Sequence, residues 1–400
     1  MPSADQLREA LVRQIRAAGG AQREPVHRAL RAVPRHVFLP EVSLEEAYAA
    51  GTPVVTKRDP DGRPLSSASA PGIVAAMLDQ LDVHPGQRVL EIGAGTGYNA
   101  ALLAELTGPG GRVTSIDVDP WCTARARRAL ERTGHAVDLR TGDGAHGTGD
   151  GATFDRIIVT AGAWDIPPAW FDQLAVGGRL VLPLRWRGQS QSVAFVREVD
   201  RLRSDGLCPA GFIPMTTLDG EERATIGETI TLVRDADQAV DVDGLWEVLD
   251  GPPSAAWTGV TADASFRTYG LWLRLTIDPR TCWLLSRHSH TAPDGSTAAP
   301  VRGPALVDGA SLALLAFRGI DEEHSELGAL GFGPSGAALA ADLASHVRAW
   351  DAARNAQPQL VAHPVGAALP DGPVPNGTVI EKRHTRLVVT YPDEHPPPKR

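Results

Sequence analysis

The chain has 400 residues, of which 42% are hydrophobic and 22% charged, and its formal net charge is -9. This composition is typical of a globular protein with two domains, not of a disordered one. The acidic balance argues against nucleic acid as the main partner, because nucleic-acid binders carry clustered positive charge. Three isolated cysteines fit neither a metal nor a disulfide pattern, and no apolar run is long enough to span a membrane. We expect a cytoplasmic monomer without a metal or a membrane partner.

Residues 1–70 are predicted to form a helical segment followed by a flap. Apolar residues recur at helical spacing from Leu7 to Ile15, and a second helix ends before Pro34. The first twenty residues are charged and amphipathic and lack the long apolar core expected of a signal peptide. The polar stretch over 56–64, rich in Pro, Asp and Gly, indicates a hairpin that forms the flap.

Residues 71–220 alternate helices with short apolar strands. A helix over 71–81 precedes the strand "RVLEIG", and the alternation continues to "GRLVLPLRW". Such a pattern indicates an α/β fold with a doubly wound, mostly parallel sheet. Residues 191–215 are expected to close it with an antiparallel strand pair.

Residues 221–392 are predicted to form a smaller C-terminal α+β domain, and 393–400 a disordered tail. Strands are expected at "ETITLVRD", "YGLWLRLTI" and "IEKRHTRLVVTYP", with a long helix over 335–355. His288 and His290 lack a third ligand at a metal-binding spacing. Four tryptophans are interpreted as core aromatics, with a peptide groove as the alternative: Trp246, Trp257, Trp272 and Trp283.

The clearest chemical signal is "VLEIGAGTGYNA", where the first strand of the sheet turns into a helix. Gly93, Gly95 and Gly97 permit a sharp turn and let a ligand reach main-chain N–H groups. A dinucleotide fingerprint would place its third glycine at Tyr98, whereas this spacing is the one expected of S-adenosylmethionine enzymes. We predict that Glu91 receives the ammonium of that cofactor, directly or through water.

Two further carboxylates follow at the ends of the next strands. Asp117 is placed to accept the ribose hydroxyls, and Asp143, next to Gly144, is placed to reach the adenine amino group. Either aspartate alone is more readily explained as a cap or turn residue. Acidic residues at three successive strand ends favour a site for S-adenosyl-L-methionine, with S-adenosyl-L-homocysteine as its product.

From its start to about residue 218, the chain resembles the protein-L-isoaspartate O-methyltransferases. The resemblance rests on "AVPRHVFLPE", "AYAAGTPV", "SASAPGIVAAML", "LEIGAGTGYNAALLAEL", "GDGAHG", "FDRIIVTAGAWDIPPAWFDQLAVGGRLVLP" and "GFIPM". It implies a Rossmann-like class I S-adenosylmethionine-dependent methyltransferase and methyl transfer to a peptide carboxylate. A carboxylate is ionised at neutral pH. The enzyme therefore needs no general base and has only to orient and desolvate the acceptor.

The resemblance also assigns the acceptor side of the site. Ser69 matches the family's active-site serine, and its hydroxyl is expected to orient the acceptor carboxylate; no neighbouring His and Asp suggest a hydrolase triad. Ser66 and Ser67 are left open between a helix cap and a substrate contact. The resemblance implies further peptide-facing residues, which are Ala70, Thr160, Ala161, Ile213 and Pro214.

Two features depart from the repair enzymes of the family. The usual glutamine and tyrosine on either side of the motif's proline are Ala70 and Gly72 here, and about 180 residues follow position 220. In these respects the chain resembles two-domain relatives that tailor ribosomally synthesised and post-translationally modified peptides. There an L-aspartate of a macrocyclic precursor peptide is esterified, and we favour a lanthipeptide here over an ester- or amide-crosslinked peptide or a lasso peptide. A backbone amide then displaces methanol to give an aspartimide, whose hydrolysis can yield isoaspartate.

Other interpretations remain open at this point. The first alternative is a repair-type enzyme that methylates isoaspartyl residues of damaged proteins. Another is a non-catalytic protein that keeps the cofactor fold as a scaffold, which is disfavoured by the intact Glu91, Asp117, Asp143 and Ser69.

Overall fold

The computed structural model describes residues 2–227, 230–263, 265–286, 297–298, 303–369 and 372–392. The chain forms two compact units: Met1–Leu184 with Ser190–Asp219, and Arg185–Gln189 with Gly220–Arg400.

The first unit begins with short helices and the expected flap. Ser3 caps the first helix in a reciprocal pair with Gln6. The polar stretch forms the turn of an antiparallel hairpin, as the sequence predicts. In chain order the elements are α1 (Ala4–Ala17), α2 (Glu24–Ala32), the 3-10 turn η1 (Arg35–Phe38), α3 (Leu44–Ala47), β1 (Val54–Arg58) and β2 (Pro64–Ala68).

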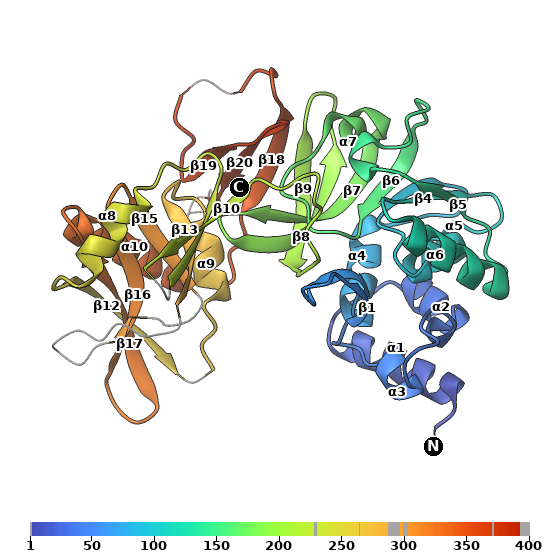
Figure 1. Ribbon diagram of the computed structural model, residues 1–400, viewed down its shortest axis with the longest axis horizontal. Coiled ribbons are helices and arrows are strands. Elements are labelled where there is room, and N and C mark those ends of the chain that lie inside the picture. Colours follow the sequence, from blue (N-terminus) through green and yellow to red (C-terminus); the bar gives the residue numbers. More distant parts are fainter. Residues whose placement is uncertain are drawn as a thin grey trace, which may run out of the picture. The chain divides into compact units, whose positions relative to one another are not determined.

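The sheet of the first unit has the strand order β9-β8-β7-β6-β3-β4-β5 (Figure 1). The central strand β3 pairs in parallel with β4 on one side and β6 on the other, so the winding reverses at β3. Ligand sites in such sheets lie at this reversal, outside the carboxyl ends of the strands. The strands are β3 (Arg88–Ile92), β4 (Arg112–Asp117), β5 (Asp138–Thr141), β6 (Phe154–Val159), β7 (Leu174–Trp186), β8 (Gln189–Arg197) and β9 (Leu202–Pro209).

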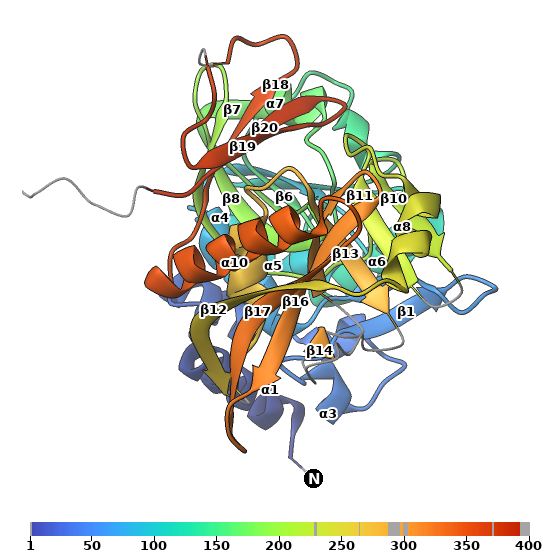
Figure 2. The same ribbon diagram turned by 90° about the vertical axis from the view of Figure 1, so that its left-hand side faces the viewer.

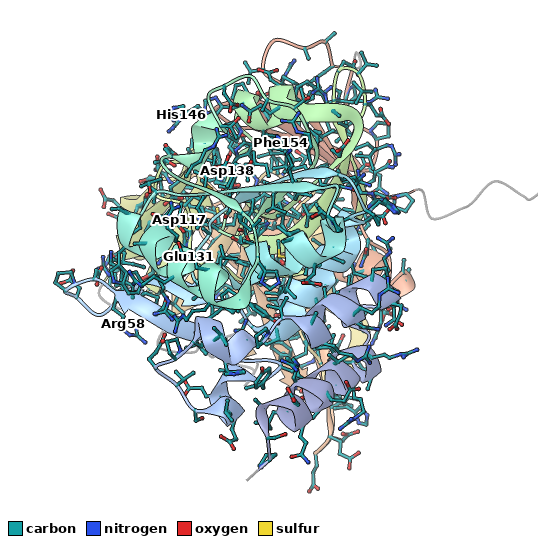
Figure 3. All side chains as sticks on the ribbon, turned by 90° about the vertical axis from the view of Figure 1, so that its right-hand side faces the viewer. Arg58, Asp117, Glu131, Asp138, His146 and Phe154 are labelled. Atoms are coloured by element: carbon teal, nitrogen blue, oxygen red, sulfur yellow. The ribbon has the colours of Figure 1, made fainter. Side chains whose placement is uncertain are left out.

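Apolar helices cover this sheet, as a doubly wound fold requires. Val89, Val113 and Ile158 of the strands pack in one buried cluster with side chains of α1, α2, α4 and α5. The sheet edge at β5 carries Asp138, and Asp117 ends the neighbouring β4 (Figure 3). The remaining elements are α4 (Pro71–Leu81), α5 (Tyr98–Thr107), α6 (Pro120–Thr133), the 3-10 turn η2 (Gly144–His146) and α7 (Pro168–Gln173).

The second unit is an α+β fold around an antiparallel sheet of order β10-β11-β13-β15-β16-β17-β12, with β14 beside β16. Helix α10 packs on β12, β16 and β17 (Figure 2), and β20 lies between β18 and β19. The elements are β10 (Glu221–Ile226), β11 (Ile230–Asp235), α8 (Val242–Leu249), β12 (Ser254–Asp263), α9 (Tyr269–Leu275), β13 (Thr281–Ser286), β14 (Thr297–Ala298), β15 (Gly303–Asp308), β16 (Ser311–Gly319), β17 (His324–Phe332), α10 (Gly336–Ala352), β18 (Gln359–Pro364), β19 (Gly377–Glu381) and β20 (Thr385–Thr390).

The prediction of a strand at "YGLWLRLTI" is wrong, because this stretch forms helix α9. Its alternating leucines fit a strand, but Leu271 and Leu275 stand one helical turn apart and both enter the buried cluster that contains α10. Trp246 is also not a core residue, since it is 46% exposed.

Two sequence predictions fall outside the described residues. These are the His288–His290 pair and the tail over 393–400. Within the described ranges, no three His, Cys, Asp or Glu side chains converge on a position that could hold a metal ion. No helix there has both the length and the apolar character of a membrane span.

Candidate active site

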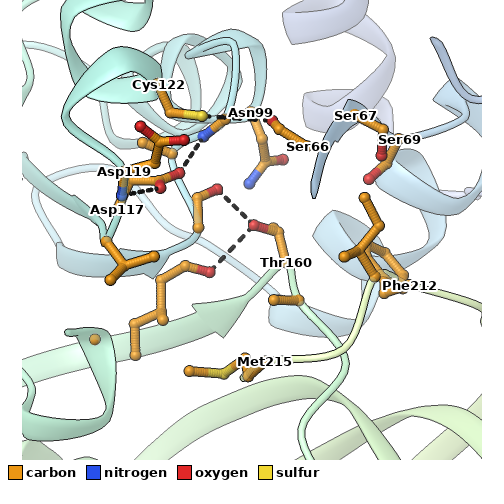
Figure 4. Close-up of a pocket in the computed structure, with 18 of the residues that line it drawn as sticks. Ser66, Ser67, Ser69, Asn99, Asp117, Asp119, Cys122, Thr160, Phe212 and Met215 are labelled. Atoms are coloured by element: carbon orange, nitrogen blue, oxygen red, sulfur yellow. Dashed lines mark hydrogen bonds between the residues drawn. The ribbon is translucent and has the colours of Figure 1, made fainter. Parts of the chain in front are cut away.

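The carboxyl ends of β3, β4 and β6 border a cavity of about 280 Å³ (Figure 4). Ser67 and Ser69 lie at one side of it and Asp117 at the other. The predicted site residues that line it are Ser66, Ser67, Ser69, Gly93, Gly95, Asp117, Asp143, Gly144, Thr160, Ala161, Ile213 and Pro214. The predicted residues that do not line it are Ala70, Glu91 and Gly97.

Glycine is required at Gly93 for space and for backbone conformation. Its φ is +104°, and a Cβ at this position would lie 2.5 Å from Thr160 Oγ1. Its N–H donates to the Ile116 carbonyl at 2.7 Å, which ties the turn after β3 to the end of β4. A backbone kept free of side chains at the switch point fits the cofactor predicted from the motif.

Gly97 has a different role from the other two glycines of the motif. A Cβ on Gly97 would lie 3.0 Å from the Ala126 Cβ, so this glycine lets α5 and α6 approach closely. Gly97 therefore lets α6 pack close behind the glycine turn, and it does not itself line the cavity.

Asp117 faces the cavity and also stabilises its wall. Its Oδ2 accepts the Gly95 N–H at 2.8 Å, and its Oδ1 accepts the Asp119 N–H at 3.0 Å. Burial raises the pKa of Asp117, and these two hydrogen bonds oppose that shift. Each carboxylate oxygen keeps a second lone pair. Asp117 can therefore still accept two hydroxyl groups, as the ribose prediction requires.

Asp143 likewise combines a cap with a position on the cavity wall. It is the N-cap of η2, where its Oδ1 accepts the Ala145 N–H at 2.9 Å. The same oxygen accepts from Thr217 Oγ1 at 3.2 Å, and Thr217 also lines the cavity. The cap interpretation and the ligand interpretation are therefore compatible at this residue.

Glu91 lies behind the cavity and is fully buried. Its two oxygens accept hydrogen bonds from Asn99 Nδ2 at 2.8 Å and Ser115 Oγ at 2.5 Å. Burial raises the pKa of Glu91 to about 7, against the effect of these donors. Asn99 lines the cavity, so it connects Glu91 to the site. The sequence signal for Asn99 was its place as a polar residue in the first turn of an apolar helix.

The serine-rich segment Ser66–Ser69 runs from strand β2 to the residue before the N-cap of α4, and the helix-cap interpretation of Ser66 and Ser67 is wrong. Both belong to β2, and Ala70 is the N-cap of α4 without any side-chain cap bond. Ser66 Oγ instead accepts from Thr56 Oγ1 at 3.2 Å and Cys122 Sγ at 3.5 Å. Ser69 Oγ makes no hydrogen bond to any described residue, which leaves it available to a ligand in the cavity.

The flap is connected to the start of α6. Lys57 of β1 pairs with Asp119, and its ammonium lies 5.7 Å from the centre of the Trp121 ring. The cavity also includes residues that sequence analysis did not single out, although several stand inside the motifs that carried the resemblance. Among them are Arg35, Leu65, Tyr98, Asn99, Asp119, Cys122, Phe212, Met215 and Thr217.

Comparison with known proteins assigns the first unit to a family. The model of the family described as protein-L-isoaspartate(D-aspartate) O-methyltransferase matches residues 6–220. The chain is 38% identical over 218 residues to the protein-L-isoaspartate O-methyltransferase of Methanopyrus kandleri, which covers 53% of this chain and 92% of the relative. It is 41% identical over 191 residues to the enzyme of Aeropyrum pernix, which covers 45% of this chain and 69% of that one.

A solved structure of a protein-L-isoaspartate O-methyltransferase extends the likeness. It aligns with 88% of this chain and 96% of its own, at 22% identity and a TM-score of 0.50. At this identity the likeness concerns the fold, and it reaches into the second unit. The family model and the sequence matches establish that the chain belongs to the protein-L-isoaspartate O-methyltransferase family of S-adenosylmethionine-dependent carboxyl methyltransferases.

Proposed function

We propose that this enzyme methylates the free carboxylate of an isoaspartyl residue in a peptide or protein. The observation that carries the proposal is one cavity that unites the glycine turn at Gly93, the carboxylates of Asp117 and Asp143, and an unengaged hydroxyl at Ser69. The names of the similar enzymes supply the acceptor class.

On the cofactor side, S-adenosylmethionine supplies the methyl group from its sulfonium. Asp117 and Asp143 offer acceptor lone pairs for the ribose hydroxyls and the adenine amino group. Asn99 lines the cavity and donates a hydrogen bond to Glu91, so it links the buried carboxylate to the cofactor side of the cavity. Because the carboxylate of Glu91 is buried behind Asn99, it favours a cationic group nearby without contacting bulk water.

On the acceptor side, the residues have to orient a carboxylate and exclude water. Ser69 Oγ donates to one acceptor oxygen and leaves the other free to attack in line. The peptide-facing wall is fixed by backbone hydrogen bonds, since Gly162 N–H donates to Ile213 O at 2.8 Å and Met215 N–H to Gly162 O at 2.9 Å. A rigid wall of this kind favours near-attack geometry. Thr160, Ala161, Ile213 and Pro214 therefore remain our proposed peptide contacts.

A second candidate is the esterification of L-aspartate in a macrocyclic precursor peptide, such as a lanthipeptide, which leads to an aspartimide. Its support is the departure from the family motif at Ala70 and Gly72, together with the region beyond residue 220 that the family model leaves unmatched.

Two observations place this candidate second. Neither Ala70 nor Gly72 lines the cavity, and Gly72 packs on Ala50, whose carbonyl accepts its N–H at 2.9 Å. The region beyond residue 220 does not separate the two candidates either, because a solved protein-L-isoaspartate O-methyltransferase aligns with 88% of the chain.

The test is methyl transfer from S-adenosylmethionine to three peptides, followed by mass spectrometry. These are a linear isoaspartyl peptide, its aspartyl counterpart, and a lanthionine-cyclised precursor with a normal aspartate. The first proposal predicts a gain of one methyl on the isoaspartyl peptide only. A gain on the cyclised precursor only, followed by loss of methanol, would replace it by the second candidate. A fourth peptide, the asparaginyl counterpart, serves as the negative control.

A further inference from the structure

Arg35, the first residue of η1, is a buried charge on the wall of the active-site cavity. Only 1% of the residue is exposed, although it lines the cavity together with Ser69. Its Nε donates to Ala47 O at 2.8 Å, and its Nη2 donates to Ser69 O at 2.8 Å and more weakly to Ala68 O at 3.5 Å. The guanidinium therefore fixes the backbone of the residue that we assign to the acceptor.

The charge of Arg35 has no counter-ion in the part of the chain that the structure describes. Carbonyl oxygens are its hydrogen-bond acceptors, and its guanidinium carbon lies 4.7 Å from the centre of the Tyr98 ring. Its Nη1 donates no hydrogen bond to a described residue. Burial lowers the pKa of Arg35, but a guanidinium remains protonated at neutral pH. An unpaired buried cation is costly, so a ligand that brings a negative charge offsets that cost.

We propose that Arg35 recognises the charge of the acceptor carboxylate. It presents the unused Nη1 and its positive charge to that carboxylate while its Nη2 holds the Ser69 carbonyl. The inference rests on the proposed function, because it takes the Ser69 side of the cavity to be the acceptor side.

The proposal predicts a selective effect on substrate capture. The negative charge of the acceptor disperses as the new C–O bond forms, so an ion pair with Arg35 is strongest before the reaction. Binding of the acceptor should therefore depend on Arg35 more than the chemical step does. A neutral carboxamide in place of the carboxylate should lose this attraction.

The experiment measures binding of two peptides to the enzyme saturated with S-adenosyl-L-homocysteine. One is the isoaspartyl peptide, and the other carries a carboxamide in place of the acceptor carboxylate. We expect the wild type to prefer the carboxylate by roughly 10-fold or more, as for the loss of a charge-assisted hydrogen bond. Arg35→Met should abolish this preference, and Arg35→Lys, which keeps the charge, should restore part of it.

Arg156→Met is the matched control. Arg156 is also a buried arginine, 8% exposed, with Nε and Nη1 each 3.0 Å from a backbone carbonyl, and it does not line the cavity. This variant should keep the carboxylate preference. Cofactor affinity and Tm, measured for every variant, show that each retains a folded cofactor site.

Equal binding of the two peptides by the wild type would overturn the inference without any variant. A carboxylate preference that survives in folded Arg35→Met would also overturn it. If Arg35→Met does not fold, loss of the preference in Arg35→Lys contradicts the role of the charge, and its retention supports it. Failure of the proposed function would look different, because the wild type would then transfer no methyl group to the isoaspartyl peptide.

Discussion

The side-chain amide of Asn99 donates a 2.8 Å hydrogen bond to Oε1 of Glu91, so a residue of the cavity wall neutralises part of a fully buried carboxylate. The glycine motif thus contributes two kinds of residue. Some, such as Asn99, line the cavity, and others, such as Glu91, lie behind them and hold them in place. Sequence spacing finds the carboxylate easily but not the amide in front of it.

Asn99→Ala should weaken cofactor binding and the protein together. Removal of the amide leaves Glu91 with Ser115 as its remaining side-chain donor, at a cost of about 1–3 kcal/mol for the lost partner. We expect roughly a 10-fold loss in affinity for S-adenosylmethionine by calorimetry and a lower Tm. Asn355→Ala, at an exposed position, should change neither value. Wild-type affinity in Asn99→Ala would show that Asn99 does not connect Glu91 to the cofactor.

The stability contribution of Glu91 should depend on pH. Its pKa in the folded protein is about 7, above the ordinary value of 4.5, so the folded state holds the proton more tightly than the unfolded state. Its favourable contribution is complete below the unfolded pKa and is lost as the pH rises through the folded pKa.

Glu91→Gln removes this titration. The free energy of unfolding of the wild type relative to Glu91→Gln should therefore fall between about pH 4.5 and pH 7, as urea unfolding of both apo proteins would measure. A difference that stays constant over this range would contradict a raised pKa.

Gly93→Ala tests the turn at the switch point. The new Cβ would lie 2.5 Å from Thr160 Oγ1, at a φ of +104° that alanine rarely adopts. We expect a loss of more than about 2 kcal/mol in stability and no measurable cofactor binding.

Gly62→Ala is the control for Gly93→Ala. Gly62 also has a positive φ, +81°, but a Cβ there would meet no atom within 4 Å. It should cost about 1 kcal/mol from backbone strain and leave cofactor affinity unchanged. Equal losses in the two variants would mean that strain alone, and not the contact with Thr160, explains Gly93.

The fold of the first unit followed from sequence because its signals are local. A recognisable pattern within a few positions of sequence indicates each of these features: the short apolar strands, the glycine turn after β3 and the acidic residues at strand ends. Helix α9 could not be predicted, because its alternating leucines fit both a strand and a helix. The burial of Leu271 and Leu275 against residues distant in the sequence selects the helix.

Part of the site could be predicted from the sequence for the same reason. Asp117 and Asp143 lie on the cavity wall as expected, whereas Glu91 lies behind it. Arg35 stands more than 30 residues before Ser69, and its bond to the Ser69 carbonyl has no periodic signature. The same holds for Thr217, which reaches Asp143 across 74 positions. Such contacts depend on tertiary structure.

The most direct test of the central claim is methyl transfer by Ser69→Ala with the isoaspartyl peptide. Ser43→Ala, which removes a helix cap away from the cavity, is its matched control. If Ser69 orients the acceptor, Ser69→Ala binds S-adenosylmethionine within about 2-fold of wild type and loses roughly 100-fold in kcat/KM, as expected for a misplaced acceptor. Weaker cofactor binding with unchanged transfer per bound cofactor would contradict the account.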